Sequence, residues 1–263
     1  MTLITILASL LLSPASHAVP SGEPINRGCF LPADQGRGSL HGQWEQLPIS
    51  LVFDSEFYSK NGGRDARALE RAVGTWNNWA KAKGKVAFVI TKRGTGQEIP
   101  ELTDCSQASY TAVVPDAVGV WKINGEGFRR NRRASCGTNS DGTPGKLLPF
   151  GTQNQTDWRI EGGKIAGASI LLNFEDYNAP GKHYLDVESR MLHELGHVLG
   201  LLHSCNGSND GGADSTTAPS CYENGKPSAP GEYLEAVMFP FLEPLELRRS
   251  LKQNDFDRVN CLY

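Results

Sequence analysis

The segment 193–203 constrains this chain more than any other, because it places three histidines at fixed spacings beside two glycines. His193 and His197 are four residues apart, so on a helix they lie about one turn apart on the same face. His203 lies six residues further on, which on a continuing helix would place it about 240° round the axis. Gly200 can adopt the left-handed conformation that ends a helix. A turn at Gly200 would return His203 to the point that the other two imidazoles face.

Three imidazoles around one point are the ligand set of a catalytic zinc site, in which the fourth coordination position stays open. We therefore expect His193, His197 and His203 to bind one Zn²⁺. Glu194 directly follows the first histidine, so its carboxylate can lie beside the metal without binding it. Zinc lowers the pKa of a bound water to about 7, and a neighbouring carboxylate can accept the proton of that water. The pattern predicts a peptide hydrolase with Glu194 as its catalytic residue.

The spacing of apolar residues predicts the elements around this segment. Ile49, Leu51 and Phe53 alternate with other residues, as in a strand, and the residues after Asp186 have helical spacing with Asp186 as the N-cap. Residues 125–163 are rich in turn formers, which favours irregular structure. Strands are expected over 49–53, 86–91, 110–114, 117–123 and 165–173, and helices over 64–82, 186–199 and 244–260.

The N-terminal segment 1–18 has the features of a secretory signal peptide, with an apolar run from Leu3 to Leu12 and a small residue, Ala18, at the cleavage point. The apolar run is too short to cross a bilayer, so no stable membrane insertion is expected. Six cysteines follow, none in a C-x-x-C pair, which favours up to three disulfides in an oxidising compartment. We expect a secreted protein, or a periplasmic one if the source is bacterial.

Composition is that of an ordinary globular chain. Residues 19–46 are rich in glycine, proline and polar residues, so they are predicted to be an N-terminal extension or a short pro-segment. The remainder, 47–263, would be one catalytic domain. We expect that domain to be a monomer.

The formal net charge of -3 gives no general attraction to nucleic acid, so no nucleic-acid partner is expected.

The segment from His193 to His203 resembles the extended zinc-binding motif of the metzincin metallopeptidases, His-Glu-x-x-His-x-x-Gly-x-x-His. Metzincins also have a methionine-containing turn beneath the zinc, and Val237-Met238-Phe239-Pro240 looks like that turn, with Met238 as its methionine. Within the clan the chain is most similar to the matrixins, in which a serine commonly follows the third histidine, as Ser204 does here. The resemblance implies a secreted zinc metalloendopeptidase whose substrate is a polypeptide.

The resemblance also implies a fold. It is an α+β fold whose α/β-like upper lobe has a five-stranded mixed sheet and the active-site helix, above an irregular lower lobe with the methionine turn and a C-terminal helix. The segment from Ile165 to Leu172 would be the edge strand along which an extended substrate lies, although a buried strand would show the same apolar pattern. The substrate-binding residues implied are Ile165, Ala166, Gly167, Ala168, Ser169 and Ile170.

Three further features are left with alternatives. Cys205 and Cys221 flank a long polar loop, and their simplest interpretation is a mutual disulfide. The oxygen-rich segment 206–214 in that loop could hold Ca²⁺ or be solvated. The sequence around Cys29 faintly resembles the matrixin cysteine switch with a different spacing, and a disulfide is the other interpretation of this cysteine.

The main alternative to an enzyme is a secreted, noncatalytic zinc-containing adhesion or binding module on the same fold. Glu194 separates the two hypotheses, because three histidines bind a metal without needing an adjacent carboxylate, whereas peptide hydrolysis needs a base. The sequence therefore favours the metalloendopeptidase.

Overall fold

The computed structural model of the protein describes residues 42–59, 63–95, 117–123, 154–174, 186–207, 218–242 and 245–263. Its strands are β1 (Ile49–Asp54), β2 (Phe88–Thr95), β3 (Ala117–Ile123), β4 (Asn154–Glu161), β5 (Lys164–Asn173), β6 (Tyr222–Glu223) and β7 (Lys226–Pro227). Its helices are α1 (Glu56–Ser59), α2 (Arg64–Lys81), α5 (Val187–Val198), α6 (Gly231–Leu234) and α7 (Gln253–Asn260).

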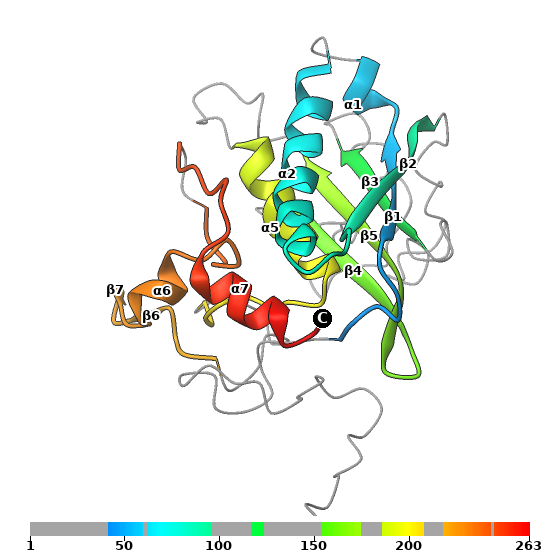
Figure 1. Cartoon of the computed structure of the whole chain (residues 1–263). Coiled ribbons are helices and arrows are strands. Elements are labelled where there is room, and N and C mark those ends of the chain that lie inside the picture. The colour runs from blue at the N-terminus through cyan, green and yellow to red at the C-terminus, as the bar shows by residue number, and fades with distance from the viewer. Residues whose placement is uncertain are drawn as a thin grey trace, which may run out of the picture.

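The five longer strands form a mixed sheet in the order β2-β1-β3-β5-β4 (Figure 1). Strands β2, β1, β3 and β5 are parallel, and β4 is antiparallel to β5. A two-residue turn at Gly162 and Gly163 joins β4 to β5, with φ of 56° and 77°. Two consecutive positive φ angles match the twist of a tight hairpin and are readily adopted by glycine. This turn places β4 at one edge of the sheet.

Helices α2 and α5 lie side by side on one face of the sheet, and the main core lies between the two layers (Figure 1). The indole Nε1 of Trp76 on α2 donates a 2.9 Å hydrogen bond to the carbonyl oxygen of Leu192 on α5. This bond fixes one helix against the other inside apolar surroundings, where an unpaired indole N–H would be costly. Core side chains shared between the layers include Leu51, Phe53, Leu69, Val73, Trp76, Val120, Ile170, Leu192 and Leu195.

The structure confirms the α+β class, the five-stranded mixed sheet and most of the expected elements. Strands β1, β3 and β5 and helices α2 and α5 occur where the apolar spacing predicts them, while β2 begins and ends later than expected. The predicted signal peptide 1–18, the strand 110–114 and most of the N-terminal extension lie outside the described residues. None of the described helices combines the length and apolar character needed to cross a bilayer.

The prediction that Ile165 to Leu172 form an edge strand is wrong. Strand β5 pairs with β3 on one side and with β4 on the other, so its backbone N–H and C=O groups are used within the sheet. Of the residues named as substrate-binding, Ala168, Ser169 and Ile170 pair with both neighbouring strands. Ile165, Ala166 and Gly167 lie before the pairing with β3 begins; they run beside β4, and Ile165 also meets Gln43 and Trp44. The edge position belongs to β4.

The irregular structure predicted for 125–163 is also wrong where β4 lies. The β4 sequence mixes polar residues with single apolar ones. Its first part is buried at Thr156 and Asp157, whereas Ile160 is 37% exposed, so the strand shows no continuous apolar run. The final helix is shorter than the predicted 244–260 and begins at Gln253. Before it, Leu245 has a φ of 69°, and the backbone N–H of Arg248 donates to Ser189 Oγ at 2.8 Å. The chain before Gln253 is thus attached to α5 and does not form the first turns of the predicted helix.

Residues 42–46 pack on the domain. The backbone N–H of Trp44 donates to the Tyr263 hydroxyl at 3.1 Å, and its indole Nε1 donates to the carbonyl oxygen of Val198 at 2.7 Å. Trp44 also forms an isolated parallel bridge with Ile165. The two ends of the described chain thus meet at the C-terminal end of α5.

A second apolar cluster lies around α6 and the small β6–β7 hairpin, beside α7 at the left of Figure 1. The predicted disulfide between Cys205 and Cys221 is confirmed and lies in this cluster, with both cysteines fully buried. Tyr233 from α6 and Phe239 pack against it. Cys261 is also disulfide-bonded, with a partner outside the described residues. The first of these disulfides closes the loop that begins two residues after His203.

Replacing Cys205 and Cys221 together by alanine is expected to lower the free energy of unfolding by about 3 kcal/mol, because the disulfide closes a loop with a sequence separation of 16. Urea unfolding of the oxidised protein measures the loss. Each single alanine variant should lose a similar amount, since either one opens the loop. Losses in the two single variants that add up to the loss in the double variant would contradict this explanation.

Candidate metal centre

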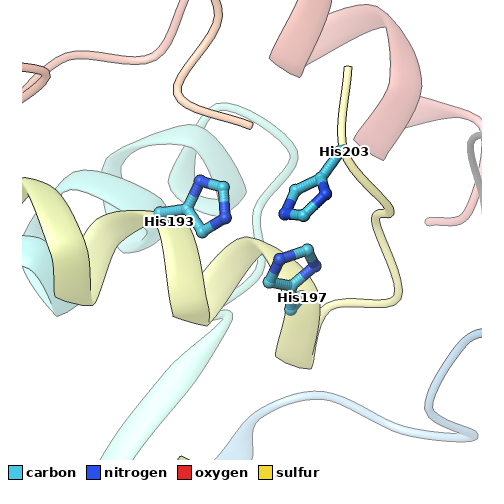
Figure 2. A group of neighbouring side chains, drawn as sticks. All are labelled: His193, His197 and His203. Atoms are coloured by element: carbon cyan, nitrogen blue, oxygen red, sulfur yellow. The ribbon is translucent and has the colours of Figure 1, made fainter. Parts of the chain in front are cut away.

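The three histidines meet at the C-terminal end of α5. His193 and His197 lie on this helix, and His203 lies on the segment after it (Figure 2). One potential ligand atom from each ring lies within 4.8 Å of the others. The ring centroids are 4.7 Å, 5.2 Å and 4.9 Å apart in the three pairs. The three histidines predicted from the sequence can therefore hold one metal ion.

Helix α5 begins and ends where the sequence predicts. The carboxylate of Asp186 accepts the backbone N–H of Ser189 at 2.8 Å, which satisfies one of the free N–H groups at the helix start. At the other end Gly200 has a φ of 98°. A Cβ at this position would also overlap the carbonyl oxygen of Gly42. Only glycine meets both conditions, and the turn that it makes directs His203 toward the other two rings.

Backbone carbonyls hold two of the imidazoles. His193 Nδ1 lies 2.8 Å from the Val237 carbonyl oxygen, and His197 Nδ1 lies 2.8 Å from that of Leu201. A carbonyl oxygen only accepts, so in each ring Nδ1 carries the proton and Nε2 keeps its lone pair. Burial, together with the nearby His203, lowers the pKa of His193 to about 3, so this ring is neutral at physiological pH. Neutral imidazoles with a free Nε2 are the donors that zinc takes in proteins.

Met238 packs against α5 between the two helical histidines. A Cβ on Gly196 would overlap Met238 Sδ, so the glycine in the motif leaves the space that the thioether fills. The Met238 carbonyl oxygen accepts the backbone N–H of Ser204 at 2.8 Å. The methionine segment is thereby joined both to the helix and to the segment that carries His203.

Helix α7 packs against the segment that carries Met238. The buried carboxylate of Asp255 accepts the backbone N–H groups of Val237 at 2.9 Å and Met238 at 3.1 Å. Burial raises the pKa of this carboxyl, although the backbone donors oppose the shift. Arg258, one turn further along, donates from Nη2 to the His203 carbonyl oxygen at 2.8 Å. Sequence reasoning missed both residues, because helical spacing predicts the helix but not what its N-terminal carboxylate contacts.

The Glu194 side chain lies beside strand β4. It is 5% exposed, and its Oε2 accepts a hydrogen bond from the Thr156 hydroxyl at 2.5 Å. Burial raises the pKa of Glu194 to about 7, and the hydrogen bond from Thr156 opposes the shift. Two residues along β4, Trp158 Nε1 donates to the His197 carbonyl oxygen at 2.8 Å. Thr156 and Trp158 were missed because β4 itself was not predicted.

Two other candidate features fall where the structure gives no description. The possible calcium segment 206–214 is described only as far as Gly207. Cys29, the possible cysteine switch, also lies outside the described residues.

Comparison of the chain with models of known protein families, and with curated proteins, found no match.

Proposed function

We propose that this protein is a secreted zinc-dependent metalloendopeptidase of the metzincin type, most similar to the matrixins. The observation that carries the proposal is the convergence of His193, His197 and His203, whose ligand atoms lie within 4.8 Å of one another. Glu194, next to the first of these histidines, supplies a buried carboxylate. The packing of Met238 against the same helix adds support, since a methionine beneath the zinc is the second feature of the clan.

The donor set fits zinc. The three imidazoles would hold the ion, and the carbonyl partners of two rings keep Nε2 free for it. When bound, zinc supplies a Lewis acid that lowers the pKa of water and polarises the scissile carbonyl. Glu194 then accepts the proton of the attacking water on its carboxylate and returns it to the leaving amine. Glu194 thus ends the reaction in the protonation state in which it began.

Strand β4 is the candidate surface for the polypeptide. Within the described part of the sheet it pairs only with β5, so its other side offers backbone donors and acceptors to an extended chain. The contacts of Thr156 and Trp158 with α5 place this edge beside the helix that carries the metal site. We therefore propose that the substrate lies along the outer edge of β4, and not along Ile165 to Ile170 as expected from the sequence.

The disulfide between Cys205 and Cys221 supports the proposed secretion, because buried structural disulfides persist in oxidising compartments. We also propose that the protein acts as a monomer on a polypeptide substrate and has no nucleic-acid partner, since no sign of charge dominates the chain.

The decisive experiment incubates the purified zinc-loaded full chain with casein and with a peptide library. We expect new amino termini from internal cleavage, complete loss of cleavage after treatment with phenanthroline, and recovery when Zn²⁺ is restored. Zinc bound at one ion per chain, with no peptide cleaved, would instead support the noncatalytic binding module. Cleavage that persists in fully metal-free protein would exclude the proposed mechanism.

A further inference from the structure

One hydrogen bond joins Glu194 to the edge of the sheet. Thr156 Oγ1 donates to Glu194 Oε2 at 2.5 Å, and the two residues are 38 positions apart in the chain. Thr156 is 9% exposed and Glu194 is 5% exposed, so water competes little for this bond. A hydrogen bond contributes more when water is excluded, and a buried partner left without it costs free energy.

The donor lies on a strand that is paired within the sheet. Thr156 is paired in antiparallel register with Ile170 of β5, in the middle of the β4–β5 ladder. Trp158, on the same face of β4, donates to the His197 carbonyl oxygen, so the strand contacts α5 at two points. The ring of Trp158 also lies edge-on to that of His197, with centroids 5.9 Å apart. The position of the Thr156 hydroxyl relative to α5 is therefore set by both backbones.

A glutamate side chain has three rotatable bonds, and an unrestrained carboxylate would sample several orientations. The Thr156 hydroxyl donates to Oε2, so one of the two carboxylate oxygens is held in a defined place. Holding a reacting group in one orientation can change a rate by orders of magnitude without any change in substrate binding. If the Thr156 hydroxyl served only the fold, its removal would change the free energy of unfolding and leave kcat unchanged.

We infer that Thr156 is a positioning residue for the general base: its hydroxyl holds the Glu194 carboxylate in the orientation that receives the proton of the attacking water. This inference rests on the proposed function. Strand β4, the candidate surface for the polypeptide, then also orients the Glu194 carboxylate.

The first test compares Thr156→Val, Thr156→Ser and Thr91→Val in the zinc-loaded chain, using a peptide substrate. Thr156→Val should lower kcat by about 10- to 100-fold with KM within about twofold and with zinc content unchanged, because it removes one hydrogen bond to a charged group. Thr156→Ser keeps the hydroxyl and should recover kcat to within about threefold. Thr91→Val is the matched control, since the Thr91 hydroxyl bonds the Leu51 carbonyl oxygen away from the site.

The second test uses metal-free protein and measures no activity. In urea unfolding, Thr156→Val should lower the folding equilibrium constant by about tenfold when Glu194 is present, and by less than about twofold in a Glu194→Ala background. Equal effects in the two backgrounds would overturn the inference, as would an unchanged kcat in Thr156→Val. If the unaltered chain cleaves no peptide, the proposed function fails, whereas this coupling still decides whether Thr156 holds Glu194.

Discussion

Replacing Glu194 by alanine is expected to lower kcat by about 10³-fold or more while the chain still binds one zinc ion. General-base catalysis by a positioned carboxylate contributes about 10²- to 10⁴-fold, and this variant removes the carboxylate entirely. Zinc binding should persist because the three imidazoles, and the carbonyl groups that hold two of them, are untouched. Hydrolysis of a fluorogenic peptide and metal analysis by mass spectrometry measure the two quantities.

Glu194→Gln is the informative companion variant. Its amide keeps the size of the side chain and an oxygen that can accept from Thr156 Oγ1, but it cannot serve as a base. It should therefore be as inactive as Glu194→Ala while unfolding at a urea concentration closer to that of the unaltered chain. Normal, chelator-sensitive cleavage by either variant would show that another group accepts the proton.

Replacing Gly200 by alanine should remove the metal site altogether. The φ of 98° is strained for any residue with a Cβ, and the added carbon would overlap the backbone oxygen of Gly42, which cannot rotate away as a side chain could. We expect a loss of more than about 3 kcal/mol of unfolding free energy, near the upper end of single-residue effects. His203 would be displaced with the turn, so zinc content should fall as well.

Gly74→Ala is the matched control. Gly74 lies inside α2, and a Cβ there would meet no atom within 4 Å. The same chemical change should therefore stabilise the protein by about 0.5–1 kcal/mol, because alanine loses less conformational entropy in a helix. Urea midpoints and zinc content of the two variants give the comparison. A Gly200→Ala protein as stable as Gly74→Ala, with zinc still bound, would disprove the role given to this turn.

Local spacing was enough to locate most of the candidate metal centre. His193 and His197 follow from the helical repeat, and the N-cap at Asp186 and the turn at Gly200 follow from conformational preferences of single residues. The same holds for strands β1, β3 and β5, whose apolar residues are buried in the core. Each of these features is encoded within a few residues, so no knowledge of distant contacts is needed.

The contacts that complete the site join residues far apart in the chain. Asp255 supports Met238 across a separation of 17 residues, and Thr156 reaches Glu194 across 38. Neither residue type is unusual at its position, so its role appears only when the partner is seen. The C-terminal helix likewise starts late because Arg248 is attached to α5, which no local pattern expresses.

The sequence by itself determined which residues come together as a candidate metal site, since the three histidines and Gly200 obey local helix and turn geometry. Only the tertiary structure decided that β4, and not β5, is the edge of the sheet beside them. The physical reason is that an edge strand pairs with one neighbour only and can leave part of its length exposed, as Ile160 is here, so it needs no continuous apolar run. Strand β4 is defined by its hydrogen bonds to β5 and by its contacts with α5.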